Sequence, residues 1–88
     1  MEKEHKNDLS NEELCVLAQG GDAEAVMLLL QNCGSYIGGL IKMLGIPPIR
    51  YRRELVERGE IGVLESIRSF DPTMGTKFLT FAHYNILN

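Results

Sequence analysis

The side chains that could take part in chemistry are concentrated in the last third of the sequence. There, Glu54, Glu57 and Glu60 recur every three residues. Residues at this spacing lie on neighbouring turns of a helix, so their carboxylates could pair for acid–base work. Exposed glutamates on a helix are far more often solvated or salt-bridged than catalytic. The pattern therefore favours a charged helix surface over an active site.

No other group of residues has the composition of a catalytic or metal site. His5 lies in a polar terminal segment, and His83 lies beside Tyr84 without a Cys, Ser or carboxylate at catalytic spacing. Cys15 and Cys33 are isolated and lack metal-ligand spacing. The segment GGLIKMLG lacks the residue order of a phosphate-binding loop. We expect no enzymatic activity and no metal or other cofactor.

Length and charge limit the class of protein. An 88-residue chain forms one domain at most, and it can bury about 60–65% of its unfolded surface. The net charge of −3 argues against a protein that holds duplex DNA by counterion release alone, because such proteins are usually basic. If the chain binds nucleic acid, another source of affinity must dominate.

The sequence predicts a cytoplasmic protein that does not enter a membrane. No apolar run approaches the ~20 residues that a membrane-spanning helix needs. The opening MEKEHKND is charged and lacks the apolar middle of a signal peptide. The cysteines are most simply small buried hydrophobes in a reducing compartment.

The first half of the chain predicts a polar tail followed by two helices. Residues 1–8 are polar and aperiodic, and we expect them to be disordered. Ser10 and Glu13 form the pattern of a capping box that starts the first helix. Asp22 is placed to cap the second helix. The Gly38-Gly39 pair within that helix indicates either a break or a close helix–helix contact.

The second half predicts two more helices joined by a tight turn. Proline suits a first helical turn, so the third helix begins near Pro48 and runs to about Ser69. Asp71-Pro72 ends it, and Gly75 suits a turn position with positive φ. The fourth helix begins near Lys77. The apolar faces of both helices follow a helical period. The face of the third helix is Leu55, Gly59, Gly62, Val63, Ile67 and Phe70, and that of the fourth is Phe78, Phe81, Ala82, Asn85 and Ile86.

These patterns predict an all-α fold. No segment alternates with period two, and there is no internal repeat. We expect a compact bundle of about four helices that forms a single domain over residues 9–88.

The segment ELVERGEIGVLESIRSFDPTMGTKFLTFAHYNILN resembles region 2 of bacterial RNA polymerase sigma factors. That region typically reads Asp-Leu-x-Gln-Glu-Gly-x-x-Gly-Leu, then Phe-Asp, then Gly-x-x-Phe-Ser-Thr-Tyr-Ala-x-x-Trp-Ile. The upstream segment LSNEELCVLAQGGDAEAVMLLLQ is more loosely similar to the opening helices of the family. The close match covers about 35 residues, including Leu55, Gly59, Gly62, Phe70-Asp71, Gly75, Lys77-Phe78, Thr80, Phe81-Ala82 and Ile86.

The resemblance implies a protein partner for the third helix. In the family, this helix docks on the clamp helices, a coiled coil of the polymerase β′ subunit. Carboxylates on the helix would meet a basic partner, which helps encounter and register more than affinity. Arg58 stands where the family usually has an acidic residue, so it implies weaker binding or a changed partner. The implied RNA polymerase-binding residues are Glu54, Leu55, Glu57, Arg58, Glu60 and Leu64.

The resemblance also implies that the fourth helix contacts promoter DNA at the −10 element, chiefly as the non-template single strand. Aromatic side chains there hold unstacked bases, and stacking contributes ~1–3 kcal/mol per base. Phe81 shares the apolar stripe, so it could instead be a core residue, whereas Tyr84 falls outside the stripe. Asn85 replaces a tryptophan that many primary sigma factors carry. The implied DNA-binding residues are Lys77, Thr80, Phe81, Tyr84 and Asn88.

Several functions fit these expectations. A complete sigma factor continues this helix and adds a C-terminal promoter-reading domain for the −35 element, both of which are missing after Asn88. The chain could be an excised domain, or half of a split factor whose second protein supplies the missing sigma regions, and an anti-sigma factor is a further possible partner. It could also be a regulatory or decoy module that binds polymerase without melting DNA. A helical regulatory domain related to sigma factors by ancestry only is the third reading.

Overall fold

The computed structural model describes residues 6–45 and 48–87. All regular structure in these two ranges is helical, which confirms the all-α class and the four α-helices. None of these helices is long and apolar enough to cross a membrane. The elements, with η for a short 3-10 helix, are η1 (Lys6–Asp8), α1 (Asn11–Gln19), α2 (Ala23–Met43), α3 (Pro48–Ser69), η2 (Pro72–Met74) and α4 (Phe78–Leu87).

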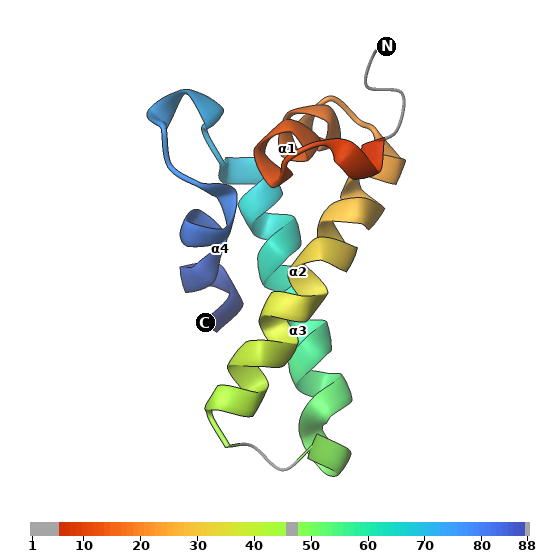
Figure 1. Ribbon diagram of the computed structural model, residues 1–88, viewed down its shortest axis with the longest axis vertical. Helices are drawn as coiled ribbons and strands as arrows, with labels where there is room; N and C mark the ends of the chain where they lie inside the picture. The colour runs from red at the N-terminus through yellow and green to blue at the C-terminus, as the bar shows by residue number, and fades with distance from the viewer. Residues whose placement is uncertain (1–5, 46–47, 88) are drawn as a thin grey trace.

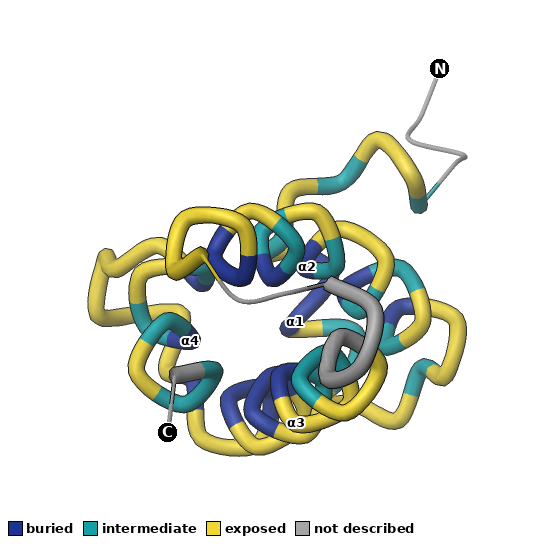
Figure 2. Tube along the Cα trace, turned by 90° about the horizontal axis from the view of Figure 1, so that it is seen from below, coloured by how far each residue is buried: buried dark blue, intermediate teal, exposed yellow. Residues whose placement is uncertain are grey.

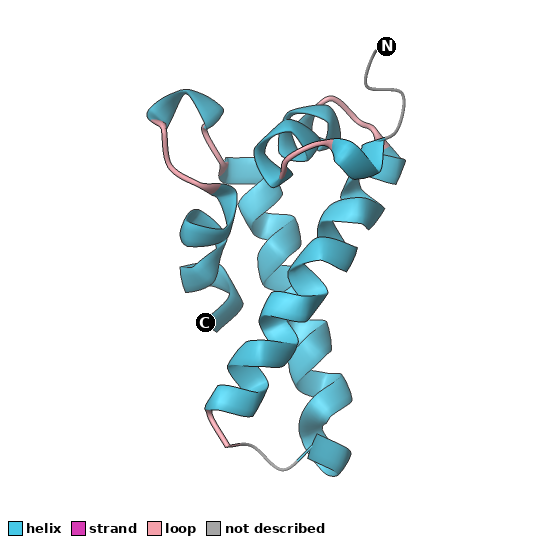
Figure 3. Cartoon of the chain, in the orientation of Figure 1, coloured by secondary structure: helices cyan, strands magenta, loops and turns pink. Residues whose placement is uncertain are grey.

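The longest helices, α2 and α3, form an antiparallel hairpin that runs the length of the molecule (Figure 1). α1 crosses one end of this hairpin, and α4 lies beside the same half of α3 (Figure 3). The molecule measures 44 × 26 × 20 Å, with the hairpin along the longest dimension. All four α-helices therefore pack together in one half, and α2 and α3 extend beyond it as a pair.

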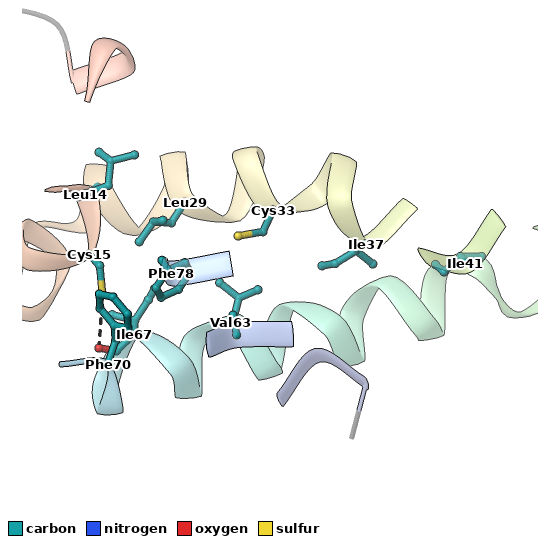
Figure 4. Close-up of a cluster of buried hydrophobic side chains, with 12 residues drawn as sticks. Leu14, Cys15, Leu29, Cys33, Ile37, Ile41, Val63, Ile67, Phe70 and Phe78 are labelled. Atoms are coloured by element: carbon teal, nitrogen blue, oxygen red, sulfur yellow. Dashed lines mark hydrogen bonds between the residues drawn. The ribbon is translucent and has the colours of Figure 1, made fainter. Parts of the chain in front are cut away.

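The hydrophobic core lies where the four α-helices meet (Figure 4). Every α-helix contributes fully buried side chains, and both cysteines are among them as free thiols. The prediction that the cysteines are small buried hydrophobes is confirmed. The core residues are Leu14, Cys15, Ala25, Leu29, Cys33, Ile37, Ile41, Val63, Ile67, Phe70, Phe78 and Ala82.

Local capping rules determine where the helices of the first half begin. The Ser10 hydroxyl accepts a hydrogen bond from the Glu13 backbone N–H, and the Glu13 carboxylate accepts one from the Ser10 N–H, so the capping box is confirmed. Asp22 caps α2 by accepting from the Ala25 N–H. At the other end of the chain, Gly75 takes a φ of 77° and ends η2 in the left-handed region, as expected.

The glycines of α2 do not break the helix, and neither Gly34 nor Gly39 marks a close contact. α2 is continuous through Gly34 and Gly39. A Cβ atom added at either position would meet no atom within 4 Å. The helix continues because Leu29, Cys33 and Ile37 bury one face of it on either side of these glycines, and this packing outweighs the cost of about 1 kcal/mol for each glycine.

Part of the segment expected to be disordered is ordered. Residues 1–5 of the expected tail lie outside the described residues, whereas Lys6–Asp8 form η1. The Lys6 ammonium lies 2.9 Å from both Asp22 Oδ2 and Glu24 Oε1. Hydrogen bonds to Glu24 and Asp22 raise the pKa of Lys6, and the Lys6 bond lowers the pKa of Asp22. This ion cluster joins η1 to the first turn of α2.

Candidate functional site

α3 carries one continuous exposed face along its outer side (Figure 2). The residues of this face recur every three or four positions, and a helix places such residues in a single row. We call this row the α3 stripe. Its members are Glu54, Glu57, Arg58, Ile61, Leu64, Glu65 and Arg68.

The α3 stripe includes two large apolar side chains among its charges. Ile61 is 56% exposed and Leu64 is 40% exposed. Arg58 lies 3.8 Å from Glu54, one turn away, in a pair so exposed that it contributes little to stability. A charged helix face that also exposes an isoleucine and a leucine has the chemistry of a protein-docking surface.

The residues expected to bind polymerase divide into two groups. Glu54, Glu57, Arg58 and Leu64 are exposed and belong to the α3 stripe. Leu55 and Glu60 are only partly exposed and flank it, and Leu55 also packs against the core. Ile61, which the sequence did not single out, lies at the centre of the stripe between Arg58 and Leu64.

Glycines on the inner side of α3 set its distance from the neighbouring helices. A Cβ on Gly59 would lie 2.9 Å from Ile37 Cδ1 of α2. A Cβ on Gly62 would lie 2.7 Å from the backbone carbon of Asn85 in α4. Both glycines therefore serve close packing within the chain, and neither contributes directly to the exposed stripe.

A second exposed face lies on α4 and the residue directly before it. It is formed by Lys77, which precedes the helix, and by Thr80 and Tyr84 of the helix, and we call it the α4 face. Tyr84 is 70% exposed, so its ring is open to a ligand. Phe81 is partly buried, and its ring lies 5.5 Å from that of Phe70 between centroids. Asn88, the remaining residue expected to bind DNA, lies outside the described residues.

Phe81 also lines a hollow beside the α4 face. This hollow has a volume of about 200 Å³ and lies between the end of α3, η2 and the first turns of α4. The Thr73 hydroxyl and backbone N–H donate to Asp71 and lower the pKa of its carboxyl group, so the hollow has an ionised wall as well as an aromatic one. Its lining residues are Ser69, Phe70, Asp71, Met74, Thr76 and Phe81.

Side chains of α1 hold the two helices that carry these faces. The Glu12 carboxylate accepts a hydrogen bond from the Phe78 backbone N–H at the start of α4. Gln19 Nε2 donates to the Ile67 and Phe70 carbonyls at the end of α3, at 2.9 and 2.7 Å. Sequence reasoning missed both contacts, since each joins residues 48 or more positions apart and leaves no local pattern.

Two polar links between helices were also missed. Asn85 Nδ2 donates to the hydroxyl of Ser66, which is fully buried and donates in turn to the Gly62 carbonyl. Tyr36 of α2 forms a hydrogen bond between its hydroxyl and His83 Nδ1 of α4. Asn85 and His83 are therefore directed toward other helices, which leaves Tyr84 as the aromatic side chain most exposed on α4.

Within residues 6–45 and 48–87, no group of three or more His, Cys, Asp or Glu residues could hold a metal ion. Comparisons of the chain with protein-family models, with curated proteins and with solved structures find no match.

Proposed function

We propose that the chain is a sigma region 2-like module of transcription initiation. It binds core RNA polymerase through the α3 stripe, with the clamp helices of the β′ subunit as the partner. It then holds unpaired bases of the promoter −10 element, chiefly on the non-template strand, with the α4 face. The sequence resemblance is the source of this proposal, and the positions of the two faces support it.

The observation that carries the proposal is the placement of the two faces on tightly packed helices. α3 and α4 approach so closely at Gly62 that no Cβ fits there, and Asn85 links α4 to Ser66 of α3. A partner bound to the α3 stripe would therefore fix the position of Tyr84. Such a geometry suits a protein that must deliver an aromatic side chain to DNA opened on another protein.

The chemistry of the α4 face suits a single strand. Lys77 is a cation for the phosphate backbone, and the exposed Tyr84 ring is a stacking surface. The hollow lined by Phe81 and Asp71 offers an aromatic wall and a hydrogen-bond acceptor to an extruded base. A chain with a net charge of −3 would gain little affinity for DNA from charge alone, so polymerase must hold it in place.

A second candidate is a regulatory or decoy module that binds polymerase without handling bases. The orientation of Asn85 favours it, because this side chain binds Ser66 instead of lying exposed beside Tyr84. The α4 face then has fewer stacking groups than the resemblance implies. Polymerase binding is common to both candidates, and base binding separates them.

One experiment in two stages tests the proposal. Tagged wild-type chain is expected to retain core RNA polymerase, and Glu54→Lys and Glu57→Lys are expected to reduce retention because they reverse exposed carboxylates. Gln31→Lys, on the exposed side of α2, is the control and should bind like the wild type. Absence of polymerase binding by the wild type contradicts both candidates.

The second stage adds a labelled −10 non-template strand to the polymerase complex and measures fluorescence anisotropy. Stacking of one base on an aromatic ring contributes ~1–3 kcal/mol to binding. Tyr84→Ala removes the ring, so it should weaken binding by roughly 5- to 150-fold. Met27→Ala, another highly exposed side chain but on α2, should leave it unchanged. If Tyr84→Ala binds the strand as the wild type does, the regulatory candidate is favoured.

A further inference from the structure

The charges of the α3 stripe have an order that suits pairing with a second copy of the same helix. Read from its N-terminal end, an acidic and a basic residue precede Ile61, and an acidic and a basic residue follow Leu64. When a helix is placed antiparallel to itself, the first pair of charges faces the second pair, in reverse order. These four charged residues are Glu57, Arg58, Glu65 and Arg68.

We propose that two copies of the chain associate through their α3 stripes as an antiparallel, two-fold symmetric dimer. Ile61 of one copy packs on Leu64 of the other at the centre. Arg58 then faces Glu65 of the second copy, and Glu57 faces Arg68. Two-fold symmetry repeats each contact, so the interface contains four opposite-charge pairs around an apolar centre.

The spacing of the stripe agrees with this arrangement. The central residues of the stripe, Glu54, Ile61 and Arg68, are seven positions apart, and Glu57 and Leu64 form a second row seven apart. When two helices pack side by side, two such rows take the heptad positions nearest the partner, called a and d. Here Ile61 and Leu64 are the apolar members of these rows, and the residues on either side of them are charged. Arg58 and Glu65 take equivalent flanking positions, which meet each other across an antiparallel pair.

The single chain leaves these groups available. Among the residues that the structure describes, the ion pair recorded on α3 is the loose contact between Arg58 and Glu54 at 3.8 Å. With the other described residues, Glu57, Glu65 and Arg68 form no ion pair. Ile61 and Leu64 also remain 56% and 40% exposed. Pairing with a second copy would remove both side chains from water and give the charges partners.

The surface beside Ile61 also has room for a side chain of the second copy. A shallow hollow of about 380 Å³ lies between α3 and α4 and is lined by Arg58, Ile61, Gly62, Glu65 and Asn85. The hollow is open to solvent beside Ile61, so Leu64 of the second copy can enter it while it packs on Ile61. Arg58 and Glu65 at its rim are the residues that pair across the two-fold axis.

This dimer would compete with the polymerase docking proposed above. The two events use the same exposed row of α3, so the chain cannot do both at once. This regulatory consequence depends on the proposed function, whereas the dimer itself does not. Arg58 has a defined role in it: the residue that departs from the acidic pattern of sigma factors is the one that makes the stripe self-complementary.

Sedimentation equilibrium of the 88-residue chain, at concentrations up to about 1 mM, tests the dimer without polymerase. For so small an interface we expect a dissociation constant on the order of 0.1 mM. Ile61→Asp should weaken the dimer at least tenfold. The matched control Met27→Asp, on an exposed position of α2, should not change the dissociation constant, and circular dichroism should show native helix content in both variants.

Charge reversal tests the antiparallel register. Arg58→Glu and Glu65→Arg should each weaken the dimer about tenfold, because each creates two like-charge contacts. The double variant R58E/E65R should restore it to within about threefold of the wild type, since the pairs are re-formed with exchanged signs. Restoration of this kind identifies the two positions as direct partners.

Three results overturn the inference. One is a wild-type chain that is monomeric at all concentrations. Another is a dimer that Ile61→Asp does not weaken, or whose double charge variant is no stronger than the single variants. The third is a dimer that Glu65→Arg alone strengthens, because a parallel pair would place Glu65 beside Glu60. Polymerase retention in the pull-down is measured separately, so failure of the dimer leaves the proposed function untouched.

Discussion

Gly62 is the residue on which the spacing of α3 and α4 depends. A side chain at this position would meet the backbone of α4 itself, at Asn85 and Ile86, and backbone atoms cannot move aside as a flexible side chain can. Gly59 faces a softer neighbour, since its added Cβ would meet the side chain of Ile37. The sequence marks both glycines as part of a motif, but only the structure separates their roles.

Gly62→Ala should destabilise the fold by about 1–3 kcal/mol, as overpacking of a core contact does. Gly34→Ala is the matched control: it is also a helical glycine, but its added Cβ meets nothing within 4 Å. That variant should gain about 0.5–1 kcal/mol from the better helix propensity of alanine. Urea denaturation followed by circular dichroism measures both. Equal effects of the two substitutions would contradict the close approach of α3 and α4.

Helical periodicity predicts which residues of α4 are exposed, but it does not predict what those residues do. Tyr84 lies outside the apolar stripe of the helix and is exposed, whereas Phe81 lies on the stripe and is partly buried. Phe81 takes part in the packing and also reaches the surface, because its ring lies close to that of Phe70 and the residue also lines a hollow. A period alone cannot separate these two roles.

At the scale of elements, α1 connects α3 and α4 through side-chain hydrogen bonds. The end of a helix leaves carbonyl groups without intrahelical partners, and Gln19 satisfies two of them at the end of α3. At its other end α1 supplies Glu12 to the first turn of α4, where a negative charge is favourable. A short helix therefore holds the turn between the helices that carry the α3 stripe and the α4 face.

Gln19→Ala should lower the free energy of unfolding by about 1–3 kcal/mol, because it removes the side-chain donor of the Phe70 carbonyl and leaves the Ile67 carbonyl only the weak donor of the Cys15 thiol. Gln31→Ala is the control, since Gln31 is an exposed glutamine on α2. It should change stability by less than about 0.5 kcal/mol. Hydrogen exchange gives a second measurement: the amides of η2 and the first turn of α4 should exchange faster in Gln19→Ala. If both variants unfold at the same urea concentration, Gln19 does not cap α3.

The helices themselves could be predicted because their signals are local. The capping box of Ser10 and Glu13, the cap by Asp22 and the turn at Gly75 each depend on residues within a few positions of one another. The contacts that join the helices are different in kind. Gln19 and Phe70 are 51 positions apart, and no local rule links them. The arrangement of α1 across α3 and α4 therefore had to come from the structure.

The candidate faces were predictable to a similar degree. Helical periodicity separates the outer side of α3 from its buried side, so the exposure of Glu54, Glu57 and Arg58 follows from the sequence. The same period leaves Ile61 off the buried face, although an isoleucine in a helix is ordinarily assigned to the core. This residue is the centre of the α3 stripe, and its exposure adds an apolar side chain to an otherwise charged surface.

At the scale of the whole molecule, a single core joins all four α-helices. Cys15 of α1 and Cys33 of α2 are both fully buried in it, and the Cys15 thiol lies 3.8 Å from the Ile67 carbonyl of α3. Burial raises the pKa of each thiol from 9.0 to about 11, with the nearby Glu12 carboxylate adding to the effect at Cys15. The reactivity of the two thiols therefore measures how often the same core opens, at two different helices.

Both thiols should resist alkylation in the folded chain at pH 8. A rise of two pKa units lowers the thiolate fraction about 100-fold, and the thiolate is the reacting form; burial also excludes the reagent. Labelling then requires opening of the core, so Cys15 and Cys33 should react at similar slow rates and both should react rapidly in urea. Mass spectrometry after timed iodoacetamide treatment measures each site. The destabilised Gly62→Ala chain should label faster at both sites by the same factor, since one core opens as a unit. Rapid labelling of one thiol while the other stays protected would show that α1 and α2 open independently.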